Sequence, residues 1–219
     1  MGSYLNPGNF SFRGSLRSKI YVDKSELIAR TNEALCTEQK YICVSRPRRF
    51  GKSMAANMLA AYYDRSEPTE ELFENLEISK DQSYKENLNK YDVIKINIQE
   101  FLSMSGTVEE MLEMLKNYLI SDFKEVYPKI HLRDERNLIQ VMKDVFSYTK
   151  CPFVILIDEW DCLFREYKQN KEEQKKYLDF LRAWLKDKDY VALAYMTGIL
   201  PIKKYGSHSA LNMFTEYSM

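Results

Sequence analysis

The chain contains few of the side chains that bind transition metals or form disulfides. Its 219 residues include two histidines, His131 and His208, which are too isolated to indicate a metal site. The cysteines show no CxxC pair and are scattered over Cys36, Cys43, Cys151 and Cys162. Because Cys43 lies inside a predicted strand, we expect reduced thiols in the core of a cytoplasmic protein.

The sequence also lacks net charge and long apolar segments. Lysine plus arginine equals aspartate plus glutamate at 32 each, so no global field attracts nucleic acid, although a local basic patch is compatible with this balance. No apolar run reaches membrane-spanning length, and the polar N-terminus has no signal-peptide core. We therefore expect a globular domain with one sizeable core and no membrane partner.

The most informative segment runs from an apolar stretch at 41–45 through a basic loop into a helix-like segment at 54–62. Strand, loop, Gly-Lys-Ser and helix in this order are the layout of a phosphate-binding P-loop. Backbone N–H groups and the helix N-terminus supply positive potential, Lys52 adds a full charge, and Ser53 would place its hydroxyl on Mg²⁺. The predicted nucleotide-binding residues are Arg46, Pro47, Arg48, Arg49, Phe50, Gly51, Lys52, Ser53 and Met54.

The first position of this loop departs from the usual pattern. Counting back from Gly51 places Arg46 where a glycine normally stands, and Pro47 biases Arg46 toward extended geometry. We therefore expect the loop to enter by a different backbone path. On this motif alone, the alternative is a serine-capped helix beside a solvated basic loop. Arg46, Arg48 and Arg49 either clamp phosphate, or complete a neighbouring subunit's site in a homo-oligomer, or contact nucleic acid or solvent.

A second motif follows about a hundred residues later. The run at 153–157 is typical of a strand buried on both faces, and it ends in Asp158 and Glu159. Asp158 is the predicted second Mg²⁺ ligand, and Glu159 is the predicted general base that polarises the attacking water. The alternative is an Asp-Glu pair that caps a helix after a core strand. Asp161 either pairs with a loop arginine or caps the following helix.

A third strand at 190–195 ends in Met-Thr-Gly, which places Thr197 at its carboxyl end. In P-loop ATPases with an additional strand between the other two, a polar residue at this point senses the γ-phosphate. Thr197 is the candidate for that role. The predicted catalytic residues are Glu159, Lys52 and Thr197. The alternative is an ordinary turn residue after a strand.

Four segments together resemble the bacterial AAA-ATPase-like family: 20–25, 45–53, 157–161 and 197–199. Proteins of that family commonly carry a PD-(D/E)XK nuclease-like domain after the ATPase, and in them an arginine in place of the first P-loop glycine is the usual form. The resemblance implies an α/β fold, a three-layer P-loop NTPase sandwich with a mainly parallel sheet of the additional-strand type. It also implies nucleotide binding more firmly than turnover.

The predicted organisation is a lead-in segment at 1–40 packed on an ATPase core at 41–219. Four strands are recognisable, at 41–45, 91–98, 153–157 and 190–195, and no buried strand is recognisable at 202–219. We therefore expect the fifth strand and the lid to be absent, and infer an N-terminal piece of a longer protein or a shortened relative. An exposed strand edge and a missing lid would make it less stable and slower at turnover than a longer form.

Base preference rests on weak signals. The string Asn89-Lys90-Tyr91-Asp92 matches a guanine motif but precedes the Asp-Glu strand, so we interpret it as a chance match and favour ATP over GTP. Tyr21 is a candidate for contact with adenine. The predicted function is MgATP binding with slow hydrolysis to ADP and phosphate. The alternatives are a non-hydrolysing regulatory module for a nuclease-like domain, and a nucleic-acid-remodelling motor, which neutral charge does not favour.

Overall fold

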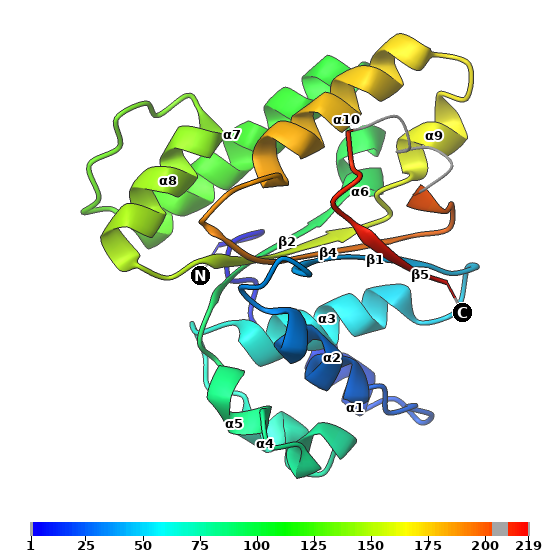
Figure 1. Ribbon diagram of the computed structural model, residues 1–219, viewed down its shortest axis with the longest axis vertical. Helices are drawn as coiled ribbons and strands as arrows, with labels where there is room; N and C mark the ends of the chain where they lie inside the picture. The colour runs from blue at the N-terminus through cyan, green and yellow to red at the C-terminus, as the bar shows by residue number, and fades with distance from the viewer. Residues whose placement is uncertain (1, 203–209, 219) are drawn as a thin grey trace.

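The computed structural model describes residues 2–202 and 210–218, so His208 lies outside the described residues. A five-stranded, all-parallel sheet lies between two layers of helices (Figure 1). The strand order is β2-β3-β4-β1-β5, which confirms the predicted α/β sandwich with β4 between the Asp-Glu strand and the P-loop strand. The strands are β1 Tyr41–Ser45, β2 Asp92–Asn97, β3 Phe153–Asp158, β4 Val191–Gly198 and β5 Thr215–Ser218.

The fifth strand is present, so the expectation that it is missing was wrong. β5 pairs parallel with β1, with Ile42 beside Thr215, and covers the β1 edge that we expected to be exposed. Its four residues lack an apolar run, which is why the sequence pattern did not reveal it. Polar contacts hold it instead, because the Glu216 carboxylate accepts hydrogen bonds from Ser45 Oγ at 2.9 Å and from Ile202 N at 3.1 Å.

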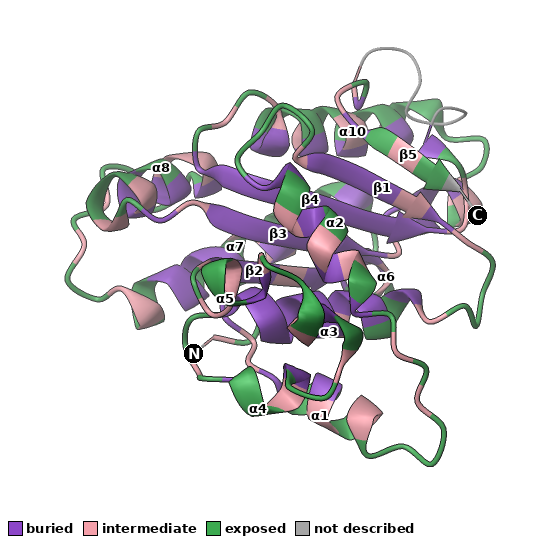
Figure 2. Cartoon of the chain, turned by 60° about the horizontal axis from the view of Figure 1, so that its bottom comes forward, coloured by how far each residue is buried: buried purple, intermediate pink, exposed green. Residues whose placement is uncertain are grey.

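The strands β1 to β4 divide their side chains between the two helix layers. On β3, Phe153, Ile155 and Ile157 join one core cluster, whereas Val154 and Leu156 join the other. All six β3 residues are buried, as expected for a parallel strand that is covered on both faces (Figure 2). This alternation explains why the run at 153–157 is continuously apolar rather than alternating.

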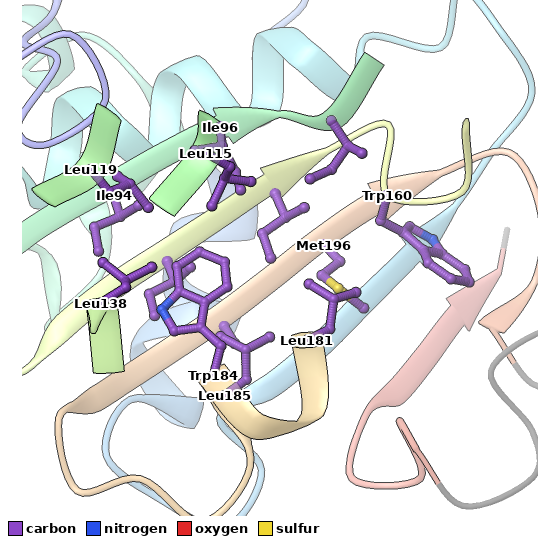
Figure 3. Close-up of a cluster of buried hydrophobic side chains, with 14 of the residues drawn as sticks. Ile94, Ile96, Leu115, Leu119, Leu138, Trp160, Leu181, Trp184, Leu185 and Met196 are labelled. Carbon is purple, nitrogen blue, oxygen red and sulfur yellow. The ribbon is translucent and has the colours of Figure 1, made fainter. Parts of the chain in front are cut away.

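One layer consists of α6 to α10, and the other of α1 to α5 with a short 3₁₀ helix (Figure 1). Leu115 and Leu119 of the first layer and Trp184 of α10 pack over the β2–β4 side chains shown in Figure 3. The helices of the first layer are α6 Ile98–Ser103, α7 Val108–Val126, α8 Leu138–Thr149, α9 Cys162–Glu166 and α10 Lys171–Leu185. Those of the second are α1 Phe10–Leu16, α2 Glu26–Ala34, α3 Lys52–Tyr63, α4 Glu70–Phe73, η1 Glu77–Lys80 and α5 Tyr84–Asn87.

Side-chain caps fix where the long helices begin. Thr107 Oγ1 accepts from Glu110 N at 3.1 Å at the start of α7, and the side chains of Asn137 and Asn170 accept in the same way at the starts of α8 and α10. The Glu110 carboxylate returns to Gly106 N at 2.9 Å, one residue before the expected capping-box partner. The helices α7, α8 and α10 therefore begin at Val108, Leu138 and Lys171, directly after these capping residues.

The lead-in segment is tied to the outer edge of β2. Leu5 forms an antiparallel bridge with Ile94, and Asn6 Nδ2 donates to the buried carboxylate of Asp92 at 2.8 Å. Arg65 approaches the same carboxylate with two donors, at 2.9 and 2.7 Å. This buried polar cluster fixes the path that carries the chain to α1 and α2 below the sheet.

Three of the four cysteines are buried, and Cys36 is exposed, so the expectation of core thiols was wrong for that residue. Burial raises the pKa of Cys43 and of Cys162 to about 12. In the part of the chain that the structure describes, no helix combines the length and the apolar character needed to cross a bilayer.

Candidate functional site

The P-loop connects β1 to α3 through residues 46–51. Its two left-handed residues are Arg49 (φ 69°) and Gly51 (φ 75°), so the left-handed geometry does not fall on Arg46, which stands at the usual glycine position. A side chain at Gly51 would be strained by this φ, and its Cβ would lie 2.9 Å from Lys24 Nζ.

Lys24 was not assigned a role from the sequence, although it lies in the 20–25 segment that carries part of the resemblance. Its Nζ donates to Phe50 O at 2.7 Å, so the chain before α2 holds the outer side of the P-loop. Pro47 to Phe50 form the exposed tip of this loop, whereas Arg46 is half-buried. Met54 follows on α3 and is 37% exposed.

The Lys52 ammonium lies folded across the loop. Its Nζ donates to Arg46 O and to Pro47 O, both at 3.0 Å, and the residue is buried. Phosphate oxygens attract an ammonium more strongly than neutral carbonyls do, because the phosphate carries a full negative charge opposite to that of the ammonium. The Lys52 ammonium therefore lies beside the loop, and phosphate oxygens could replace the two carbonyl oxygens that it now contacts.

The carboxylate of Asp158 is the centre of the site. Ser53 Oγ donates to Asp158 Oδ2, and Thr197 Oγ1 donates to Asp158 Oδ1. The three residues come from the start of α3, the end of β3 and the end of β4, and both Asp158 and Thr197 are buried. The structure thus brings together three residues that the sequence predicted separately, because parallel strands present their carboxyl ends at one edge of the sheet.

Glu159 follows Asp158 in a left-handed conformation (φ 54°), and its backbone N–H donates to Asp158 Oδ1 at 3.0 Å. Its carboxylate pairs with Arg165 on α9, and the side chains are 23% and 20% exposed. Arg165 was not identified from the sequence. The signal for it was available in the four-residue spacing from Asp161, but the short helix α9 was not predicted.

Asp161 lies at the N-cap of α9, as one of its two predictions had it, but its side chain is used elsewhere. Its Oδ2 accepts backbone hydrogen bonds from Ile199 N at 3.1 Å and Leu200 N at 2.9 Å, just beyond β4. Its ion-pair partner is Arg165, at 3.5 Å, rather than a loop arginine. Although Asp161 occupies the N-cap position of α9, its side chain makes no capping hydrogen bond.

A pocket of about 670 Å³ lies beside the P-loop. Leu27 and Ala34 of α2 form one wall, and Ile42 and Val44 of β1 form another, with Tyr217 of β5 among the other lining residues. Acidic and basic side chains of residues 23–33 line it as well. Tyr21, the predicted adenine contact, is not among the lining residues and packs against Phe12 with ring centroids 6.3 Å apart.

The donor set at Asp158 suits a magnesium ion. Mg²⁺ is usually held by one or two protein oxygens, several waters and the phosphates of its substrate, rather than by an all-protein cage. Ser53 and Asp158 are an adjacent hydroxyl and carboxylate of this kind. The described residues contain no group of three or more histidine, cysteine, aspartate or glutamate side chains placed to hold a metal.

A family model described as "Predicted AAA-ATPase" matches residues 12–207. The chain belongs to the AAA-ATPase-like family. This membership confirms the resemblance and supports nucleotide binding in general by this AAA-ATPase-like chain. Among curated proteins, the search returned no match.

Proposed function

We propose that this chain binds MgATP and hydrolyses it slowly to ADP and phosphate. The observation that carries the proposal is the convergence of Ser53 and Thr197 on the two carboxylate oxygens of Asp158, next to a P-loop. Hydroxyl, carboxylate and ammonium groups at this edge of a parallel sheet form a polar site that suits a charged phosphate chain with its cation.

The phosphates would lie against the loop at 46–51 and the N-terminus of α3. Backbone N–H groups and the helix dipole attract anions there, and Lys52 would exchange its two carbonyl acceptors for phosphate oxygens. Arg46, Arg48 and Arg49 lie in the same loop and can add bidentate contacts to phosphate.

Ser53 and Asp158 would hold the magnesium ion. When bound, the ion would offset negative charge on the β- and γ-phosphates. In the present arrangement the Ser53 hydroxyl donates to Asp158 Oδ2. The two oxygens are therefore close enough to bind the same ion. Thr197 would then lose its bond to Asp158 or share it with the γ-phosphate.

Hydrolysis needs a base near the γ-phosphate, and Glu159 is the candidate. The water oxygen bonds to the γ-phosphorus, the bond from that phosphorus to the β–γ bridging oxygen breaks, and the water proton passes to the Glu159 carboxylate. General-base catalysis of this kind contributes about 10²–10⁴-fold.

The nucleoside would occupy the pocket between α2, β1 and β5. Its apolar walls at Leu27, Ala34, Ile42 and Val44 suit a planar base, and Tyr217 offers an aromatic edge from β5. The volume of about 670 Å³ is within the usual range of roughly 300–1,000 Å³ for small-molecule sites.

A non-hydrolysing regulatory module is the second candidate. It is supported by the pairing of Glu159 with Arg165, because the guanidinium occupies Oε2 of this carboxylate and holds the side chain beside α9. Steady-state release of phosphate separates the two candidates. The nuclease-like domain, the homo-oligomer and the cytoplasmic location stay predictions.

The first test is thermal stability with ATP, ADP and GTP, each with and without Mg²⁺. A ligand at 100 times its Kd adds about 2.7 kcal/mol, which raises the melting temperature of a domain of this size by roughly 5–10 °C. We expect such a shift with MgATP, a smaller one with GTP, and none in Lys52→Ala. The absence of a shift with every nucleotide at millimolar concentration would contradict the proposal.

A further inference from the structure

Tyr195 of β4 differs from the other buried tyrosines in the hydrogen bonding of its hydroxyl. Tyr41 Oη donates to Leu185 O at 3.0 Å, and Tyr177 Oη donates to Trp160 O at 2.9 Å. The hydroxyls of the remaining buried tyrosines are paired as well, on Tyr62, Tyr63, Tyr84 and Tyr190. Tyr195 is 2% exposed, yet its hydroxyl has no partner within the described residues. Because buried polar groups are almost always paired, this hydroxyl requires an explanation.

The Tyr195 hydroxyl opens onto the pocket beside the P-loop. Tyr195 is one of the residues that line this cavity of about 670 Å³. In the part of the chain that the structure describes, the fully enclosed side-chain atoms without a partner belong to Trp160, Asp161, Arg165 and Glu173. The Tyr195 hydroxyl is not one of them, so it is in contact with open space, and the space that this residue lines is the pocket.

Strand register places Tyr195 below the phosphate end of the site. It lies beside Ile42 on β1, and the P-loop begins only after Ser45, three residues further along that strand. At about 3.3 Å per residue this separation is roughly 10 Å. Tyr195 and Ile42 belong to the same core cluster, so both point toward the layer that contains α2 and α3. The hydroxyl is therefore placed for the nucleoside part of a ligand whose phosphates lie on the P-loop.

The pocket combines apolar walls with a charged rim. The wall residues are buried or half-buried and apolar: Leu27, Ala34, Ile42 and Val44. The charged lining residues of α2 are exposed at the rim: Glu26, Arg30 and Glu33. A planar base suits apolar walls, with one or a few polar groups to fix its orientation, whereas ribose hydroxyls suit a charged and solvated rim. Tyr195 supplies a polar group of this kind among the apolar walls.

The Tyr195 hydroxyl stays protonated in this environment. Burial raises the pKa of Tyr195 well above its ordinary value, and the nearby Cys43 and Asp158 raise it further, against the opposing effect of Arg46. A protonated phenol both donates and accepts hydrogen bonds. It can therefore donate to a ring nitrogen of a base or accept from its amino group.

We propose that Tyr195 binds the base of the nucleotide through its hydroxyl, within the pocket between α2, β1 and β5. The hydroxyl lacks a partner in the free chain and gains one when a base enters the pocket. This inference rests on the proposed function and deepens it, because it assigns the base to a particular side chain.

The test compares Tyr195→Phe with the unsubstituted chain, since phenylalanine removes only the hydroxyl. Tyr41→Phe is the matched control, because Tyr41 lies on β1, packs in the opposite core cluster and loses a hydroxyl that is already bonded to Leu185 O. The melting temperature without ligand is measured for the three proteins, together with the Kd for MgATP and for tripolyphosphate with Mg²⁺.

We expect Tyr195→Phe to bind MgATP about two- to tenfold more weakly, the loss that corresponds to one hydrogen bond, with unchanged affinity for tripolyphosphate. Its melting temperature without ligand should be unchanged or higher, because no hydrogen bond within the chain is lost. Tyr41→Phe should show the reverse, with a lower melting temperature and an unchanged Kd for MgATP.

Analogues of ATP locate the partner of the hydroxyl. The series 1-deaza-ATP, 3-deaza-ATP, 7-deaza-ATP and purine riboside triphosphate removes one polar group of adenine at a time. The analogue that lacks the partner should bind equally to Tyr195→Phe and to the unsubstituted chain. The 2′-deoxy and 3′-deoxy forms of ATP should keep the full difference, and equal affinity for either of them would assign the hydroxyl to the ribose and overturn the inference.

Three further results would overturn it. The first is an unchanged Kd for MgATP in Tyr195→Phe, which leaves the nucleotide site intact. The second is a lower melting temperature of Tyr195→Phe without ligand, which would make the hydroxyl part of the fold. The third is an equal loss of affinity for tripolyphosphate, which would assign it to phosphate. If MgATP gives no thermal shift in the unsubstituted chain, the proposed function fails together with the inference.

Discussion

Ser53, at the start of α3, donates its hydroxyl to Asp158, at the end of β3. The two residues are separated by 105 positions in the chain and meet because α3 and β3 open onto the same edge of the sheet. These two side chains are the proposed magnesium ligands, so substituting either should change nucleotide affinity only when Mg²⁺ is present.

Ser53→Ala and Asp158→Asn should weaken MgATP binding while they leave the weaker binding of metal-free ATP nearly unchanged. Each removes one oxygen ligand of the proposed ion, and we expect a loss of about tenfold or more in affinity for MgATP, or ~1.4 kcal/mol. Titration with and without EDTA measures the difference. Ser18→Ala on the exposed end after α1 is the control, and an equal loss with and without the metal would contradict the assignment of these ligands.

Lys52→Ala should weaken the binding of ATP, ADP and inorganic tripolyphosphate alike, because the lost interaction is with phosphate. A reduction of about tenfold or more is expected from the loss of a charge-assisted hydrogen bond, worth roughly 1.5–3 kcal/mol. Calorimetry measures all three ligands. Lys116→Ala, on the surface of α7, should bind as the unsubstituted chain does; unchanged affinity in Lys52→Ala would remove this lysine from the site.

Glu159→Gln should bind MgATP with unchanged affinity and release phosphate about 10²–10⁴-fold more slowly. The amide keeps the shape of the side chain but cannot accept the water proton. Glu166→Gln on α9 is the control. Unchanged turnover in Glu159→Gln would show that another group is the base.

Leu27→Trp should block nucleotides without affecting phosphate binding. The indole would fill the wall of the pocket from α2, where Leu27 is half-buried beside the P-loop. We expect loss of the ATP and ADP thermal shifts with the tripolyphosphate shift retained. If ATP still binds to this variant, the nucleoside does not occupy the pocket.

Arg65→Ala should destabilise the fold and spare the site. Asp92 is fully buried, and removal of its arginine partner leaves an uncompensated charge, which typically costs 3–5 kcal/mol. Urea unfolding measures the loss, and the Kd for MgATP of the folded fraction should not change. Arg30→Ala, which breaks the exposed pair with Glu33, should change stability by less than about 1 kcal/mol.

The sequence was sufficient where structure follows from local pattern. The P-loop, the buried β3 run and the polar residue that ends β4 each carry their own signature, and parallel strands necessarily bring Asp158 and Thr197 to the same edge. The capped helices at 107, 137 and 170 were predictable for the same reason, since Thr and Asn caps act on the residues immediately after them.

The elements that sequence analysis missed depend on distant partners. β5 has no apolar pattern. The Glu216 side chain on this strand accepts hydrogen bonds from Ser45 of β1 and from Ile202, which follows β4. Arg165 lies on a helix of five residues, which is too short for a periodic pattern. Its ion-pair partners, Glu159 and Asp161, lie in the turn after β3, and no sequence pattern indicated that this turn would contact α9. The pocket walls likewise combine α2 with β1 and β5.

The position of β1 in the sheet has a consequence for the order of folding. Both of its neighbours come from much later in the chain, with Tyr41 beside Ala194 on one side and Ile42 beside Thr215 on the other. Such non-local pairings form slowly, because a long loop must close before any contact stabilises it. The strand that leads into the P-loop is therefore made early in synthesis and paired late. A nucleotide that binds the completed site as proposed would stabilise the chain after this last step, so refolding with ATP should yield more native protein than refolding without it.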